Sequence, residues 1–354
     1  MIDSIVWKSF VNKRTNTFTI ATGSSDVEEN VIAKVVAGDE FGIGSGSPSK
    51  VTRETLQSIE TFLSATPKKL IGTDETDLLK LHQRLDSIAL GNTAAKVAID
   101  IAIFDLLSKR AGKPLFEYLG GSRDRMMTDI TISIAPKEVT VKKALLHFKA
   151  GFRALKLKVG LDLEGDIQRV AAVREAVGPR VEVRIDANQG YTVEQAIKFS
   201  EAMVPYDVAV IEQPVPADDY KGLKAVTEAS SIPIMADECV KSVLDARKVA
   251  REGDADMINI KLMKSAGISD AVMINRLAGS TDMNTMVGCM GEIQASIAAG
   301  LHFALSSENV KFADLDSHFS IVGDPSSGLA FSDGYLIASD RPGLGVTTPL
   351  DGLE

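Results

Sequence analysis

The chain has 354 residues, of which 45% are hydrophobic and 25% are charged. These fractions are typical of globular proteins and exclude a disordered, collagen-like or coiled-coil chain. The length suits two domains, or one barrel-sized domain with an addition. With 39 Lys and Arg against 48 Asp and Glu, the net charge is −9. The surface therefore repels a phosphate backbone on average, and no nucleic-acid partner is expected.

Cysteine usage and hydropathy indicate in which cellular compartment the chain is expected. Cys239 and Cys289 are 50 positions apart and match neither a disulfide framework nor paired zinc ligands, which predicts a reducing cytoplasm. The N-terminus alternates like a strand and has no secretory pattern. The most apolar stretch, residues 94–107, is interrupted by three charged residues, so no membrane partner is expected.

The N-terminal part, residues 1–124, has an α+β pattern. Alternating runs at 2–10 and 31–37 predict strands, and the glycine-rich stretch 42–48 predicts a turn-rich loop. Helical patterns follow at 53–65, 75–87 and 94–110.

From residue 125 onward, short β-branched runs alternate with amphipathic segments. The predicted strands are 129–134, 154–159, 181–186, 208–212, 233–237, 257–261, 284–287 and 311–315. Eight is the number that a closed parallel barrel requires. Successive strand ends at 158, 186, 212, 237 and 261 leave room for one helix and two short loops in each interval. We therefore predict a (β/α) barrel.

Three consecutive predicted strands end in carboxylates: Asp186, Glu212 and Asp237. In a barrel these ends converge on the face where active sites lie. Each Asp alone is equally well explained as a helix cap. Three converging carboxylates, however, repel one another unless a hard cation neutralises them, and a donor set of oxygens alone favours Mg²⁺ over Zn²⁺.

Lysines flank these carboxylates. Lys156 and Lys158 are two residues apart on one strand, so both side chains face the barrel interior. Lys261 ends a strand four positions further along the ring, which puts it across the barrel from Lys158. Two lysines on opposite sides of a substrate suit a 1,1-proton transfer, because one removes a proton from one face and the other delivers one to the opposite face. Desolvation and neighbouring cations lower a lysine pKa toward neutrality.

Five motifs occur together in the order and spacing of a known family. They are KLK at 156–158, DANQGY at 186–191, IEQP at 211–214, ADE at 236–238 and NIKLMKSAG at 259–267. With them, nearly the whole chain resembles the enolase superfamily, in particular its muconate-lactonizing subgroup and the dipeptide epimerases related to L-Ala-D/L-Glu epimerase. The resemblance implies an α/β fold, a modified (β/α)8 TIM-type barrel with an α+β capping domain. Its expected parts are a capping domain (1–124), a catalytic barrel (125–323) and a C-terminal segment that returns to the capping domain (324–354).

The resemblance also implies roles. The expected Mg²⁺ ligands are Asp186, Glu212 and Asp237, the expected acid/base residues are Lys158 and Lys261, and Lys156 is expected near the substrate carboxylate. In this chemistry a base removes the proton next to a carboxylate to give an enediolate, whose charge the metal and an ammonium group stabilise. The protein is therefore expected to be an isomerase, a racemase or epimerase acting on amino acids and their derivatives.

At the end of the eighth strand, the resemblance implies that Asp314 and Asp316 bind the free α-ammonium group of a dipeptide. The same pair is compatible with a simple turn. Thr131 and Cys289 are expected as further substrate contacts, although Cys289 is equally explained as a small packing residue.

Relatives selective for a C-terminal Glu carry an Arg in the capping loop, where this sequence has Gly23. We therefore expect an L-Ala-L-Xaa substrate with an apolar or small Xaa rather than Glu. Arg14 is displaced from that position, and Asp26 leaves a cationic Xaa open. A homo-oligomer is also expected.

Two alternatives stay open. An o-succinylbenzoate synthase or N-acylamino acid racemase would use the same site, but its substrate offers no ammonium group to Asp314 and Asp316. A barrel that only binds or assembles would not need three converging carboxylates and two opposed lysines.

Overall fold

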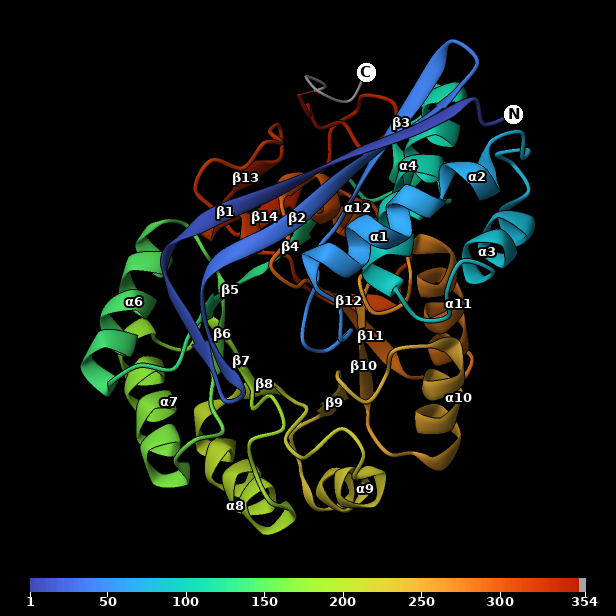
Figure 1. The fold of residues 1–354 in the computed structure, drawn as a ribbon. Helices are drawn as coiled ribbons and strands as arrows, with labels where there is room; N and C mark the ends of the chain where they lie inside the picture. Colours follow the sequence, from blue (N-terminus) through green and yellow to red (C-terminus); the bar gives the residue numbers. More distant parts are fainter. Residues whose placement is uncertain (350–354) are drawn as a thin grey trace.

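The computed structural model describes residues 1–349, so residues 350–354, the end of the expected C-terminal segment, lie outside the described part. Its centre is an eight-stranded parallel sheet in the order β12-β11-β10-β9-β8-β7-β6-β5 (Figure 1). The strands are β5 (Asp129–Ile132), β6 (Ala154–Lys158), β7 (Glu182–Asp186), β8 (Val208–Glu212), β9 (Ile234–Ala236), β10 (Met257–Lys261), β11 (Asn284–Gly288) and β12 (Val310–Asp314). A parallel bridge between Thr128 and Ala313 joins the two edges. The predicted barrel is confirmed.

Helices cover the outside of the barrel, one after each strand from β5 to β11 (Figure 1). They are α6 (Lys137–Lys149), α7 (Leu163–Val177), α8 (Val193–Met203), α9 (Tyr220–Ala229), α10 (Val243–Glu252), α11 (Ile268–Gly279) and α12 (Gln294–Leu305). After β12 comes the short 3₁₀ helix η2 (Ser317–Ser320), and no α-helix follows it within residues 1–349. Strands such as β6 and β10 are buried along their whole length, as expected where helices pack on one face and the barrel interior lies on the other.

The N-terminal region begins with an antiparallel sheet of β1 (Ser4–Ile20), β2 (Gly23–Ala37) and β3 (Glu40–Gly46). The β1–β2 hairpin is much longer than the two predicted strands, and it extends across one end of the barrel (Figure 1). Near its tip, the Thr19 carbonyl accepts a 3.0 Å hydrogen bond from the backbone N–H of Ile134, just beyond β5. The hairpin tip is thus attached to the barrel.

The prediction of a loop at residues 42–48 is wrong, because residues 42–46 belong to β3. Glycine is required there by packing against helix α4 (Thr93–Arg110) rather than by a turn. A Cβ at Gly42, Gly44 or Gly46 would lie within 2.0 Å of a backbone oxygen of α4. The missing side chains let the sheet and the helix backbone pack in direct contact.

The remaining helices of the N-terminal region are α1 (Leu56–Ala65), α2 (Pro67–Leu70), α3 (Leu78–Asp86) and α5 (Leu115–Tyr118). Buried Asp100 on α4 links this region to the barrel. Its carboxylate accepts hydrogen bonds from the Ile268 N–H at 2.6 Å and from the Ser269 hydroxyl at 2.7 Å, at the start of α11. Satisfying free N–H groups at a helix start stabilises that helix.

Beyond η2, the strands β13 (Ala330–Ser332) and β14 (Tyr335–Ile337) form a small sheet with β4 (Arg125–Met127). Further along, the Leu344 N–H donates to buried Asp105 on α4 at 2.8 Å. The domain boundaries at 124/125 and 323/324 stay predictions. No described helix has the length and apolarity needed to cross a lipid bilayer.

Candidate active site

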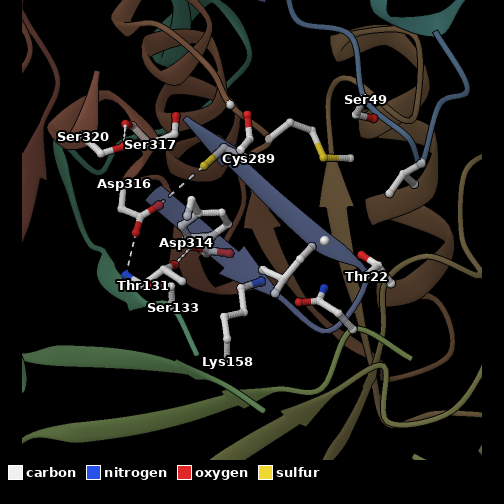
Figure 2. A pocket seen from close by; sticks show the side chains of 18 of the residues that line it. Thr22, Ser49, Thr131, Ser133, Lys158, Cys289, Asp314, Asp316, Ser317 and Ser320 are labelled. Atoms are coloured by element: carbon white, nitrogen blue, oxygen red, sulfur yellow. Dashed lines mark hydrogen bonds between the residues drawn. The ribbon is translucent and has the colours of Figure 1, made fainter. Parts of the chain in front are cut away.

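A cavity of ≈1460 Å³ lies between the β1–β2 hairpin and the carboxyl ends of the barrel strands. The hairpin contributes residues such as Phe18 and Gly23, and the strand ends contribute Lys158, Lys261 and Asp237. Figure 2 shows Thr22 and Ser49, from the N-terminal region, on the side of the cavity away from Asp314 and Asp316. The site is therefore built from both parts of the chain.

The structure brings together the three carboxylates singled out in the sequence. Asp186 and Glu212 are the last residues of β7 and β8 and pair in register, and Asp237 directly follows β9. All three are at most 1% exposed. Burial and the nearby Asp186 charge raise the pKa of Glu212 to about 7. The cluster therefore holds more negative charge than a buried site tolerates without cations.

Lys156 lies beneath this cluster and is 1% exposed. Its Nζ is 2.7 Å from Glu212 Oε2, 3.0 Å from Asp186 Oδ2 and 2.6 Å from Asp314 Oδ2. Burial alone would lower the pKa of its ammonium group, but the surrounding carboxylates raise it well above the usual value. Lys156 thus connects the three-carboxylate cluster to the Asp314 side of the site.

Lys158 and Lys261 lie on β6 and β10, four positions apart in the sheet order. Lys158 Nζ donates to Asp186 Oδ2 at 2.6 Å, and Lys261 Nζ donates to Asp237 Oδ2 at 2.8 Å. Gly288 pairs with Lys261 on the next strand, and a Cβ there would lie 3.0 Å from Lys261 Cε. Glycine therefore leaves space for the lysine stem to reach the cavity.

The donor set fits a hard divalent cation. It consists of carboxylate oxygens from neighbouring strands, the ligand type that Mg²⁺ prefers. Two further oxygens in the same place, Glu238 Oε2 and Asn188 Oδ1, are buried without a hydrogen-bond partner. Burial and the neighbouring Asp237 charge raise the pKa of Glu238 to about 8. The lysines offset part of the negative charge, and the unpartnered Glu238 oxygen leaves a donor for a further cation such as a metal ion.

A second, smaller anionic cluster lies at the ends of β11 and β12 (Figure 2). Ligand atoms of Cys289, Asp314 and Asp316 all lie within 4.8 Å of one another. The Thr131 N–H donates to Asp316 Oδ2 at 2.6 Å, and the Cys289 thiol lies 3.8 Å from Asp316 Oδ1. Thr131 Oγ1 also lies 3.5 Å from Asp314 Oδ1. Two buried carboxylates beside a hydroxyl and a thiol suit an organic ammonium group better than Mg²⁺.

On the capping side, Arg14 lines the cavity, but its guanidinium is already in contact with residues of this chain. Its guanidinium forms an ion pair with Glu28, donates to Ser320 Oγ at 2.8 Å and stacks 4.4 Å from the Phe18 ring. The Asp26 carboxylate accepts a hydrogen bond from Thr17 at the outer part of the hairpin.

Lys50, a residue the sequence reading did not single out, lies beside Gly23. Its Nζ would be 2.9 Å from a Cβ placed on Gly23, and it donates to the Thr22 carbonyl at 3.4 Å. Sequence reasoning also gave no role to Asn259 or Lys264. Asn259 could have been found, because it precedes Lys261 by two residues on one strand and so shares its face.

Residues 2–120 match the model of the mandelate racemase / muconate lactonizing enzyme N-terminal domain, and residues 140–351 match the enolase C-terminal domain-like model. The chain belongs to the enolase superfamily. This confirms the resemblance that the five motifs indicated. The two matched ranges cover the N-terminal region and, from residue 140 onward, all barrel strands after β5.

Within the family, the chain is 39% identical over 340 residues to the hydrophobic dipeptide epimerase of Enterococcus faecalis, covering 95% of this chain and 96% of that protein. It is 37% identical to the L-Ala-D/L-Glu epimerase of Clostridium acetobutylicum, with coverage of 93% and 94%. The structure is also similar, with a TM-score of 0.95 and 36% identity, to a dipeptide epimerase from Enterococcus faecalis V583 in complex with Mg and L-Leu-L-Tyr. That alignment covers 98% of this chain and 99% of the other.

Proposed function

We propose that the protein is a Mg²⁺-dependent dipeptide epimerase that inverts the α-carbon of the C-terminal residue of an L-Ala-L-Xaa-type dipeptide. One observation carries the proposal: Lys158 and Lys261 approach the cavity from opposite strands, next to carboxylates on one side and a buried Asp314/Asp316 pair on another. This arrangement offers two proton-transfer groups, a metal site and an ammonium site around one position.

In the proposed reaction, Lys158 removes the α-proton from one face of the substrate and Lys261 returns a proton to the other, or the reverse. Asp186, Glu212 and Asp237 would hold Mg²⁺, which when bound neutralises charge that develops on the substrate carboxylate. Lys158 donates to Asp186 and Lys261 to Asp237, so both are ammonium groups in this structure. Burial alone would lower the pKa of Lys261, but Asp237 and the other nearby carboxylates raise it. The lysine that acts as base must therefore lose a proton and leave its carboxylate before it accepts the α-proton of the substrate.

The orientation of the substrate follows from the planarity of the enediolate. The two lysines face opposite sides of that plane, the carboxylate is directed to the β7–β9 side, and the amide leads toward Asp314 and Asp316. The Xaa side chain, the remaining substituent, must then point out of the barrel toward the β1–β2 hairpin. Specificity for Xaa therefore depends on the capping side of the cavity.

For Xaa we propose an apolar or small side chain. The capping side contributes Phe18, Ile20 and Val51 to the cavity wall, and burying apolar surface against them is favourable. Lys50 is the cation through which an acidic Xaa would be accepted, while Arg14 is held by Glu28.

The runner-up function is an o-succinylbenzoate synthase or N-acylamino acid racemase. The buried Asp314/Asp316 pair favours a substrate with a free ammonium group over both. We further propose a cytoplasmic location, since both cysteines are free and disulfides are rare in reducing compartments. The homo-oligomer stays a prediction.

The proposal is tested by incubating the enzyme and Mg²⁺ with a dipeptide library in D₂O and following deuterium uptake at the α-carbon. We expect uptake at the C-terminal residue together with formation of the L,D-dipeptide. Uptake with N-acylated amino acids but not with free dipeptides would support the runner-up instead.

A further inference from the structure

A buried lysine outside the cavity, Lys264, has three short contacts that the proposed reaction does not use. It is 2% exposed and follows β10. Its Nζ donates to Asp237 Oδ1 at 2.6 Å, to the Asp237 backbone carbonyl at 2.5 Å and to the Asn259 carbonyl at 3.0 Å. Burying a lysine costs free energy. Its three contacts, to the Asp237 carboxylate and to two backbone carbonyls, therefore require an explanation.

Lys264 and Lys261 divide the two oxygens of Asp237 between them. Lys264 binds Oδ1, whereas Lys261, which lines the cavity, binds Oδ2. When Lys261 leaves Asp237 to take part in proton transfer, Oδ2 becomes available and Oδ1 stays attached to Lys264. The contact with Lys264 therefore decides which oxygen of Asp237 faces the metal site.

The same pattern extends to the neighbouring ligand through Asn259. Its side-chain N–H donates to Glu212 Oε1 at 2.7 Å, while its carbonyl accepts from Lys264. Asp186 is fixed in a similar way, because its Oδ1 accepts from the Asn188 N–H at 2.9 Å. Each of the three carboxylates thus has at least one oxygen held by a group other than the two acid/base lysines.

We propose that Lys264 is a positioning residue that, together with Asn259, fixes the orientation of Asp237 and Glu212 and thereby makes the site selective for Mg²⁺ over Ca²⁺. The inference rests on the metal-ligand roles in the proposed function. Mg²⁺ demands near-ideal octahedral geometry, whereas Ca²⁺ accepts more ligands in flexible arrangements, so rigid carboxylates favour Mg²⁺. Groups that orient metal ligands typically contribute ~10- to 100-fold to metal affinity or activity.

The test uses the full chain with Lys264→Met, and calorimetry of Mg²⁺ and Ca²⁺ binding without any dipeptide. We expect Mg²⁺ affinity to fall by ~10- to 100-fold and Ca²⁺ affinity to fall less, so that the Mg²⁺/Ca²⁺ preference decreases. Lys264→Arg, which keeps the charge and several donors, should recover part of the preference. Lys96→Met is the matched control, because Lys96 is also buried and paired, with Asp86 at 2.5 Å on the N-terminal side.

If Lys264 acted through its charge alone, the change in metal affinity would have the opposite sign. Removing a positive charge beside a cation site, with no effect on orientation, would tighten the binding of both ions. Tighter Mg²⁺ binding, or an equal loss for both ions, would overturn the proposal. The Asp237 N–H is held independently by Gln213 Oε1 at 2.9 Å, which favours folding of the variant; if Lys264→Met does not fold, Lys264→Gln is measured in the same way. Because no dipeptide is present in this measurement, a changed Mg²⁺/Ca²⁺ preference would support the role of Lys264 even if the protein epimerised no dipeptide.

Discussion

The barrel and the β1–β2 hairpin face the same cavity with different kinds of side chain. The barrel strand ends present buried ionic groups fixed by short contacts, such as Lys156 among three carboxylates. The hairpin presents half-buried or exposed residues such as Phe18 and Thr22, and Lys50, a cation beside its tip, has a long contact of 3.4 Å to the Thr22 carbonyl. The comparison indicates that the reaction depends on the barrel and the choice of Xaa on the hairpin. Removing a barrel group should therefore stop turnover, and changing the hairpin side should only change substrate preference.

The largest effect is expected at the metal site. Glu212→Gln replaces one of three anionic ligands by a neutral amide, and the loss of several kcal/mol of charge stabilisation corresponds to a fall in kcat of ~10³-fold or more. Steady-state kinetics with the preferred dipeptide measures it, with Glu117→Gln, at an exposed position of α5, as the control. Full activity of the wild type in excess EDTA would contradict the metal assignment.

Substitutions of Lys158 and of Lys261 should differ in the stereoisomer on which the variant still acts. Lys158→Ala and Lys261→Ala should each abolish epimerisation, because one of two proton-transfer groups is missing. Each variant should still exchange the α-proton of one stereoisomer with D₂O, and the two variants should act on opposite stereoisomers. Proton NMR of the L,L- and L,D-dipeptides distinguishes them. The two-sided arrangement is wrong if both variants exchange the same stereoisomer equally.

The ammonium site should give the next largest effect. Acetylating the dipeptide amine removes a charge-assisted contact and leaves Asp314 and Asp316 facing a neutral group. Truncating one partner of a buried charged pair costs ~2 to 5 kcal/mol, so kcat/KM should fall at least ~100-fold. Competition between free and acetylated L-Ala-L-Leu measures the ratio. A preference for the acetylated compound would support the racemase alternative.

The smallest effect is expected on the capping side. L-Ala-L-Leu should be a better substrate than L-Ala-L-Glu, and Lys50→Met should lower only the activity toward L-Ala-L-Glu. An exposed ion pair contributes ~0.2 to 1 kcal/mol, so the change should be a few-fold. Lys142→Met, at another cavity-lining lysine, is the control. A wild-type preference for L-Ala-L-Glu would refute the apolar assignment and give Lys50 the larger role.

The sequence predicted the barrel far better than the N-terminal region. Barrel strands are short β-branched runs at regular intervals, so their number and order could be read from the chain. The strand at Gly42–Gly46 could not, since its glycines are required by contact with α4, which is distant in sequence. The long hairpin was missed because its outer half is mostly polar, with half-buried and exposed residues and few apolar ones.

The site shows the same limit. Residues at strand ends, such as Asp186 and Lys261, were predictable because strand direction determines where their side chains point. Lys264 lies in a turn after β10, and only the folded turn directs its side chain back to Asp237. The position of Lys50 beside Gly23 likewise depends on tertiary packing between two loops.

The separate attachment of Lys158 to Asp186 and of Lys261 to Asp237 has a kinetic consequence. After conversion of an L,L- to an L,D-dipeptide, the protonation states of the two lysines in the free enzyme are reversed. The lysine that acted as base is charged, and the lysine that acted as acid is neutral. The enzyme that releases product is thus a tautomer of the enzyme that binds substrate. Before the next cycle in the same direction, the charged lysine must release a proton to solvent and the neutral lysine must take one up. If the lysines act as proposed, this return between tautomers is a step of every turnover, separate from the chemistry on the dipeptide.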